Sequence, residues 1–122
     1  MIRRVISFKY AGEGIITALK DEPNLKVHFS IGCLAVLLGY FFQITRLEWF
    51  VLILVIGMVI TIELTNTAIE ELVNTFTDKL HPSAKKAKDV AAGAVLISSI
   101  TALVIGVIIF FPYIYRLLVK SL

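Results

Sequence analysis

The chain has 122 residues, of which 58% are hydrophobic, and its mean hydropathy is +0.90. Soluble globular domains are only about 45–50% apolar, so this composition excludes an ordinary soluble enzyme and predicts an integral membrane protein. The formal net charge is +3, and the chain is too short for two domains. We therefore expect a single all-α membrane domain over residues 1–122, with the lipid bilayer as its surroundings and no nucleic-acid partner.

The first half of the chain predicts a surface helix and one membrane span. Residues 2–21 mix apolar side chains with Arg and Lys, which is typical of an amphipathic helix lying on a membrane surface, although Gly12 and Gly14 interrupt the pattern. Asp21-Glu22-Pro23 predicts a turn or a helix start. Residues 27–45 contain no Lys, Arg, Asp or Glu, and their number matches the about 20 residues that a spanning helix needs.

The second half predicts two further spans. A short hairpin loop at 46–48 leads into the second span, 49–70. A polar connection at 74–89 then precedes a long apolar third span, 89–115. Trp49, Tyr113 and Tyr115 are expected in the aromatic belts at the membrane surfaces.

Polar side chains gather on one face of the second span, where its apolar run ends. At about 100° per residue, five of them fall within an arc of about 100°, whereas Glu71 points elsewhere. An ionisable group at membrane depth is costly, so the default interpretation of such a stripe is functional. Its members are Glu63, Asn66, Thr67, Glu70 and Asn74.

The basic residues predict the orientation in the membrane. Cytoplasmic segments carry an excess of Lys and Arg, and nine of the twelve basic residues fall on one side of the predicted spans. This distribution places the N-terminus, the 74–89 connection and the polar stripe at the cytoplasmic face of the cell membrane. The nine are Arg3, Arg4, Lys9, Lys20, Lys26, Lys79, Lys85, Lys86 and Lys88, and the remaining three are Arg46, Arg116 and Lys120.

The residue types at this face suit phosphoryl transfer. Carboxylates bind Mg²⁺, which proteins usually hold with one or two carboxylates plus substrate phosphates, and Lys and Arg bind phosphate. A carboxylate at an apolar interface also suits a general base for a lipid hydroxyl. The chain has neither a Walker A sequence nor a kinase glycine-rich loop, so a kinase here belongs to neither common type.

Two motifs carry a resemblance to a known family. The segments Glu63-Leu64-Thr65-Asn66-Thr67-Ala68-Ile69-Glu70 and Ala87-Lys88-Asp89-Val90-Ala91-Ala92-Gly93-Ala94-Val95-Leu96 resemble those of the small bacterial diacylglycerol kinases, which include undecaprenol kinases. The resemblance extends over nearly the whole chain. It implies a homotrimer of three-span subunits with an N-terminal surface helix, and Mg²⁺- and ATP-dependent phosphorylation of a membrane lipid alcohol.

The resemblance also implies residue roles. Glu63 resembles the catalytic base and Asn66 the catalytic amide beside it. Glu22 and Glu70 resemble the Mg²⁺ ligands that bridge to ATP. The remaining matches are to nucleotide-binding positions, namely Arg3, Tyr10, His81, Lys88 and Asp89.

One position departs from the family pattern, and one stretch of sequence indicates a branch within the family. Asn74 stands where relatives often have Asp, which removes a charge near the nucleotide. The Pro23–His28 stretch resembles the undecaprenol kinase branch, because the diacylglycerol branch tends to carry an acidic residue at the position of His28. We therefore expect undecaprenol as the substrate, with diacylglycerol as the alternative. His28 itself is expected at the membrane interface, without a metal role.

Structural interpretations stand beside these functional ones. Glu63 could pair with a cation of another helix, Glu22 could serve the helix dipole, and Asp89 could cap the third span. Lys85 and Lys86 are interpreted as topology signals only. A non-enzymatic alternative is a small proton-coupled transporter, but the acidic residues cluster at one face and the first span contains none.

Overall fold

The computed structural model describes the backbone of residues 2–76 and 81–120 and the side chains from residue 7 onward in those ranges. Four helices follow one another: α1 (Ile2–Asp21), α2 (Pro23–Phe42), α3 (Arg46–Phe76) and α4 (Pro82–Lys120). No strand occurs in these ranges. The predicted all-α fold is therefore confirmed. Lys79, one of the cations used to predict orientation, lies outside the described residues.

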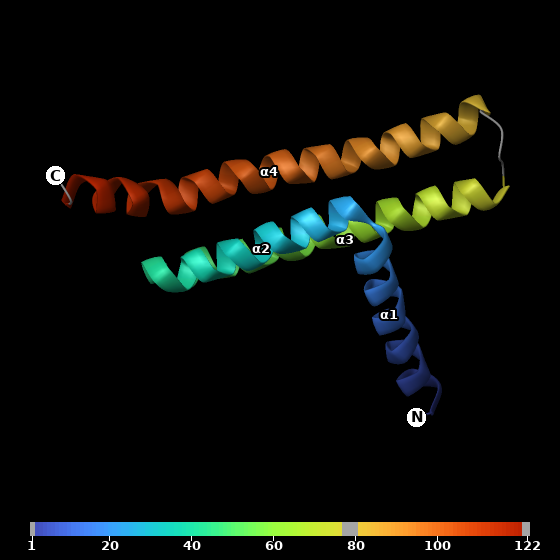
Figure 1. Ribbon diagram of the computed structural model, residues 1–122, viewed down its shortest axis with the longest axis horizontal. Helices are drawn as coiled ribbons and strands as arrows, with labels where there is room; N and C mark the ends of the chain where they lie inside the picture. The colour runs from blue at the N-terminus through green and yellow to red at the C-terminus, as the bar shows by residue number, and fades with distance from the viewer. Residues whose placement is uncertain (1, 77–80, 121–122) are drawn as a thin grey trace.

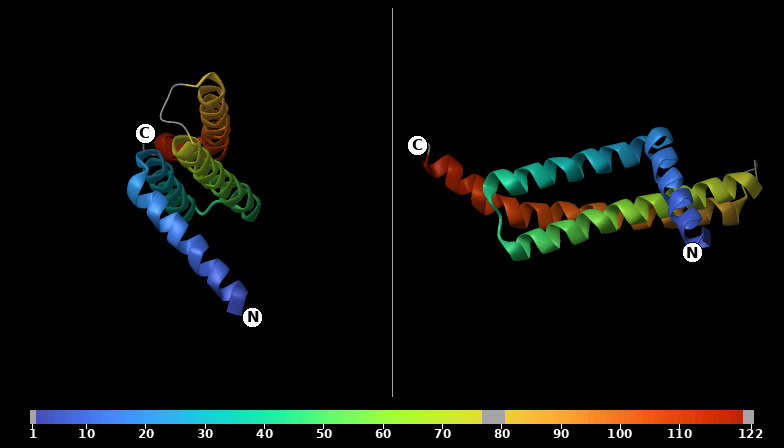
Figure 2. Two further views of the ribbon diagram at one scale, coloured as in Figure 1. Left: turned by 90° about the vertical axis from the view of Figure 1, so that its right-hand side faces the viewer. Right: turned by 90° about the horizontal axis from the view of Figure 1, so that it is seen from below.

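Helices α2, α3 and α4 run alongside one another, and each is long and apolar enough to cross a membrane. Helix α1 leaves the start of α2 at a steep angle (Figures 1 and 2). It continues through Gly12 and Gly14, so the glycines do not interrupt the helix. Three apolar spans and a separate N-terminal helix match the architecture expected from the sequence.

Two predicted connections are wrong in extent. The loop expected at 46–48 is the first turn of α3, because Thr45 and Glu48 form a reciprocal capping box: Thr45 N–H donates to Glu48 Oε2 (2.7 Å) and Glu48 N–H donates to Thr45 Oγ1 (3.3 Å). The polar connection expected at 74–89 is mostly helical. Helix α4 begins at Pro82, a residue suited to a first helical turn, so Asp89 lies well inside α4 and does not cap it.

Helix α3 provides the central packing surface. Helices α2 and α4 each pack against α3, and they contact each other much less. The buried apolar residues of α3 are Leu52, Val55 and Val59, at helical spacing. At Gly39 an added Cβ would lie 2.8 Å from the Trp49 ring, so only glycine allows this close approach of α2 and α3. This packing fixes which face of α3 is covered along its whole length.

Candidate functional site

The covered face of α3 turns from apolar to polar at Glu63. Leu52, Val55 and Val59 are buried at helical spacing along this face. The next buried residues along it are Glu63, 2% exposed, and Asn66, 9% exposed. One turn later Glu70 is half-buried, and Asn74 is exposed. The predicted polar stripe therefore faces the interior of the bundle at its buried end and solvent at the other.

The buried part of this stripe has unsatisfied hydrogen-bonding capacity. Within the described residues, Glu63 Oε2 and Asn66 Oδ1 are buried and have no hydrogen-bond partner. The amide of Asn66 donates from Nδ2 to Glu70 Oε1 (3.1 Å), which orients that carboxylate. Leaving polar oxygens buried and unpaired is costly, so these two atoms are candidates for a contact with a group outside the chain.

Three side chains lie close enough to Glu63 for their charge to act on its carboxylate: His28, Glu70 and Glu22. Glu22 occupies the N-cap position of α2, where the chain turns out of α1, and Pro23 follows it as the first helical residue. His28 lies on the next turns of α2 and is half-buried. The fold thus brings Glu22, distant in sequence, to the same end of the bundle as Glu63 and Glu70.

The sequence analysis placed His28 at the membrane interface without a metal role, and the structure adds that His28 lies near Glu63. A signal was available: Leu25, His28 and Gly32 recur at helical spacing, and Leu25 and Gly32 are buried. His28 therefore belongs to the face of α2 that packs on α3, and this face brings it near Glu63.

Helix α4 contributes two of the predicted nucleotide residues. Lys88 Nζ donates to Asn74 Oδ1 (2.5 Å), which joins the start of α4 to the end of α3. Asp89, in contrast, pairs with Lys85 one turn away on the same helix (2.5 Å). Lys85, predicted to be only a topology signal, thus also neutralises Asp89 on an exposed surface.

Two further predicted nucleotide residues, His81 and Tyr10, lie next to the start of α4 and on α1. His81 accepts a hydrogen bond at Nδ1 from Ser83 N–H (3.2 Å), beside the start of α4. Tyr10 is exposed on α1. Arg3 lies in α1, but its side chain is outside the described residues. These positions keep their nucleotide role only as a prediction.

The carboxylates near Glu63 fit a magnesium ion held jointly with a substrate. Among the described residues no group of three or more metal-ligating side chains is assembled. Glu22 and Glu70 nevertheless both lie near Glu63. Mg²⁺ commonly takes one or two carboxylates and completes its shell with phosphate oxygens and water, so the chemistry of these side chains suits this ion.

The opposite end of the bundle is held by a second acidic residue of α3, Glu48. Its Oε2 accepts hydrogen bonds from Thr45 N–H (2.7 Å), Thr45 Oγ1 (2.9 Å) and Tyr113 OH (2.7 Å). Arg116 lies 5.8 Å from the centre of the Tyr113 ring. Tyr113, expected as a belt residue, therefore also links α4 to the start of α3.

Fold and site together define a small multi-pass membrane protein with a buried acidic site at one end of its helices. The sequence model of prokaryotic diacylglycerol kinases matches residues 9–110, and the chain belongs to this family. It is 42% identical over 106 residues to an undecaprenol kinase of Bacillus subtilis, covering 87% of this chain and 86% of the relative.

Two further relatives are diacylglycerol kinases. The chain is 34% identical to one from Synechocystis over 116 residues, which is 94% of this chain and 66% of the relative. It is 30% identical to another from Haemophilus influenzae over 106 residues, which is 86% of this chain and 90% of the relative. The family resemblance on the two sequence motifs is thereby confirmed.

Proposed function

We propose that this protein is an ATP-dependent lipid kinase that transfers the γ-phosphate of ATP to the hydroxyl of undecaprenol. Membership of the prokaryotic diacylglycerol kinase family supports phosphoryl transfer to a lipid alcohol. The choice of undecaprenol is supported by the relative from Bacillus subtilis, an undecaprenol kinase that aligns over most of both chains. Diacylglycerol is the alternative acceptor, supported by the relatives with that name.

The observation that carries the proposal is the buried carboxylate oxygen Oε2 of Glu63, which has no hydrogen-bond partner in the part of the chain that the structure describes. A lipid hydroxyl that donates its hydrogen bond to this oxygen would be held at the depth where the apolar face of α3 ends. Glu63 would take the proton as the hydroxyl oxygen attacks the γ-phosphorus, and ADP would leave. Asn66 would keep Glu70 oriented through its amide and offer its own Oδ1 to the bound substrates.

The remaining polar residues are assigned to the nucleotide. Glu22 and Glu70 would hold a Mg²⁺ ion, which neutralises phosphate charge when it is bound with ATP. Lys88 would contact phosphate after leaving Asn74, and Asp89 would complete the nucleotide site. Arg3, Tyr10 and His81 are proposed as outer nucleotide contacts, which requires α1 to approach the site.

Two features of the assembled enzyme belong to the proposal. The site would lie at the cytoplasmic face, because Lys20, Lys26 and the lysines of early α4 are at its end of the bundle. The working form would be a homotrimer, a subunit number that rests on the resemblance of the two sequence motifs to the family. Crosslinking in mild detergent that yields only monomer would contradict the homotrimer.

The test of the function is transfer of radiolabelled phosphate from MgATP by purified protein in detergent. Undecaprenol and diacylglycerol are offered side by side at equal mole fractions. Preferential labelling of undecaprenol is expected. Preferential labelling of diacylglycerol would show that diacylglycerol is the acceptor and would leave the assignment as a lipid kinase intact. Labelling of neither lipid would refute lipid phosphorylation. ATP-independent, proton-coupled uptake in vesicles would favour the transporter alternative.

A further inference from the structure

Glu63 is buried too deeply to pass a proton to water directly. Its side chain is 2% exposed, and the residues one and two turns before it on the same face of α3, Val59 and Val55, are buried as well. In the proposed function Glu63 takes one proton from a lipid hydroxyl in every turnover. It must lose that proton before it can act again, so a second group has to receive it.

The neighbours of Glu63 differ in their ability to receive this proton. Three ionisable side chains of the described residues lie close enough for their charge to act on it: His28, Glu70 and Glu22. Both carboxylates are assigned to a metal ion in the proposed function, and a carboxylate in water accepts protons only at acidic pH. Histidine, in contrast, is the side chain that gains and loses a proton near neutral pH. The chemistry of the three neighbours therefore favours His28.

The placement of His28 also suits a proton acceptor. Helix α2 begins at Pro23, so His28 lies only about 8 Å along the helix axis from this start, at 1.5 Å per residue. Its side chain is half-buried, whereas that of Glu63 is almost fully buried. Lys26 and Val27, just before it, are exposed. His28 thus lies between the buried carboxylate and the end of the bundle at which α2 begins.

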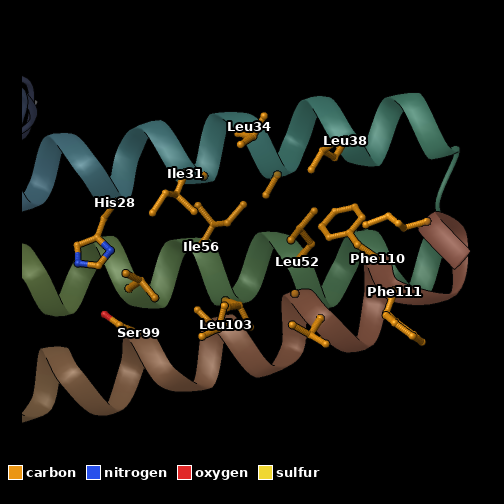
Figure 3. A pocket seen from close by; sticks show the side chains of 18 residues that line it. His28, Ile31, Leu34, Leu38, Leu52, Ile56, Ser99, Leu103, Phe110 and Phe111 are labelled. Atoms are coloured by element: carbon orange, nitrogen blue, oxygen red, sulfur yellow. The ribbon is translucent and has the colours of Figure 1, made fainter. Parts of the chain in front are cut away.

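On its other side, His28 borders an apolar cavity between α2, α3 and α4. Among the described residues that line this cavity, His28 is the one ionisable side chain, and Ser99 is the one other polar side chain. Figure 3 shows both of them at one end of the cavity, with aliphatic and aromatic side chains beyond them. The hydroxyl of Ser99 donates to Val95 O (2.9 Å). The cavity therefore contains no second group that could take the proton.

The two groups between which the proton would move are not engaged elsewhere. Glu63 Oε2 has no hydrogen-bond partner within residues 2–76 and 81–120. In the same ranges no hydrogen bond or ion pair involves the imidazole of His28. A neutral imidazole has one ring nitrogen that accepts a hydrogen bond or a proton. His28 can therefore accept a proton without first breaking a contact of the fold.

We propose that His28 receives the proton that Glu63 takes from the lipid hydroxyl and releases it to water at the end of the bundle where α2 begins. This inference rests on the proposed function. As the hydroxyl oxygen bonds to the γ-phosphorus, its proton moves to Glu63 Oε2 and the bond between phosphorus and ADP breaks. The proton then moves to the unprotonated ring nitrogen of His28, directly or through one water molecule. The imidazolium gives one N–H proton to water, and both side chains regain their starting charge.

His28→Gln tests this role, because the amide keeps a polar side chain but cannot take up a proton. Ser99→Ala is the control, since it removes the other polar side chain at the same end of the cavity. The measurement is kcat of the purified protein in detergent and dilute buffer, with MgATP and the lipid alcohol that the transfer assay identifies. In His28→Gln kcat should fall about a hundredfold, the lower end of the range for general acid–base groups, with KM for ATP unchanged. Ser99→Ala should keep the wild-type kcat.

Added imidazole separates proton transfer from a merely structural role of His28. Imidazole in the medium can take the proton in place of the missing ring, so it should restore most of the kcat of His28→Gln as its concentration rises. Wild type and Ser99→Ala should not respond. A methylimidazole that is a stronger base should shift the acidic limb of the rescued pH profile to higher pH. A variant that only disturbed packing would respond to neither base.

The pH profile of wild type is a second readout. Once His28 is protonated it cannot accept another proton, so kcat should be lost as pH falls and regained as pH rises. The carboxyl groups that face His28 and Glu63, those of Glu22 and Glu70, are also present in His28→Gln. A loss of the acidic limb in His28→Gln without added base would therefore assign this limb to His28.

Two results would overturn the inference. One is a His28→Gln enzyme that keeps the wild-type kcat at every buffer concentration. The other is a fully active His28→Lys enzyme, which would show that a positive charge beside Glu63 is sufficient. His28→Asn replaces His28→Gln if the latter does not accumulate. A wild type that transfers phosphate to no lipid alcohol would refute the proposed function and this inference with it, whereas an active wild type with an unaffected His28→Gln would refute the proton acceptor alone.

Discussion

Two acidic residues of helix α3, Glu48 near one end of the bundle and Glu63 toward the other, have opposite surroundings. Glu48 accepts three hydrogen bonds at a single oxygen, from Thr45 and Tyr113. Glu63 is 2% exposed, and its Oε2 has no hydrogen-bond partner among the described residues. The first arrangement stabilises a helix start, and the second keeps an acceptor available. From this difference we infer that the Glu48 end is structural and that the Glu63 end is the proposed site of the chemistry.

Hydrogen-bond and desolvation energies support this distinction between Glu48 and Glu63. A hydrogen bond to a charged group is worth about 1.5–3 kcal/mol, so the contacts of Glu48 stabilise the fold directly. A buried carboxylate oxygen without a partner gains no such hydrogen bond, and it still carries the free-energy cost of losing its hydration. We infer that this unfavourable arrangement of Glu63 is kept because a bound substrate donates a hydrogen bond to the oxygen.

The largest expected effect is that of Glu63→Gln on turnover. The amide keeps the size of the side chain but cannot accept the proton of the lipid hydroxyl, so kcat should fall by about a hundredfold to ten-thousandfold. ATP binding, measured by equilibrium dialysis, should persist. Glu71→Gln is the control, because Glu71 is exposed on another face of α3. A Glu63→Gln enzyme with wild-type kcat would eliminate Glu63 as the base.

The next effect concerns Mg²⁺. Glu22→Ala and Glu70→Ala should each raise the Mg²⁺ concentration needed for half-maximal activity, by about tenfold or more, because each removes one carboxylate of the proposed ligand pair. Titration of activity with MgCl₂ at saturating ATP measures this. Glu71→Ala should keep the wild-type requirement. Unchanged titrations for both Glu22→Ala and Glu70→Ala would refute the metal assignment.

A smaller effect is expected for Tyr113→Phe, which removes one hydrogen bond to Glu48. The free energy of unfolding should fall, because one hydrogen bond to a carboxylate is lost, with kcat per folded molecule unchanged. Tyr115→Phe is the matched control, since Tyr115 is 59% exposed. Denaturant titration in detergent reports the stability. A loss of kcat in Tyr113→Phe at full stability would mean that the Glu48 end participates in the chemistry.

The smallest effect is predicted for Asn74→Asp. Lys88 donates to Asn74 Oδ1, and an aspartate there would hold the lysine more strongly and add negative charge beside the proposed phosphate contact. An exposed ion pair is worth about 0.5–1 kcal/mol, so KM for ATP should rise about two- to fivefold with kcat unchanged. Thr75→Asp controls for added charge alone. A lowered KM for ATP would show that an acidic residue here assists nucleotide binding.

The chemical end was more predictable from sequence than the structural end. The stripe from Glu63 to Asn74 lies on one helix, where the 3.6-residue period fixes which side chains share a face. The period did not show which face of the bundle this stripe occupies, and the burial of Glu63 and Asn66 came from the structure. The family motifs supplied the roles, because no periodicity distinguishes a base from a metal ligand.

The structural end depends on contacts that a local pattern does not contain. Tyr113 and Glu48 are separated by 65 positions, and their hydrogen bond follows from how α4 packs on α3. The capping box itself was visible in Thr45-Arg46-Leu47-Glu48, and recognising it would have corrected the start of α3. The proximity of His28 to Glu63 likewise required the register of α2 on α3.

One measurement tests the division between the two ends most directly: turnover and unfolding free energy determined together for Glu63→Gln and Glu48→Gln. The account predicts opposite outcomes. Glu63→Gln should be nearly inactive and at least as stable as wild type, because it removes the charge of a buried carboxylate whose Oε2 has no hydrogen-bond partner among the described residues. Glu48→Gln should be less stable but fully active per folded molecule. An inactive, stable Glu48→Gln, or an active Glu63→Gln, would contradict it.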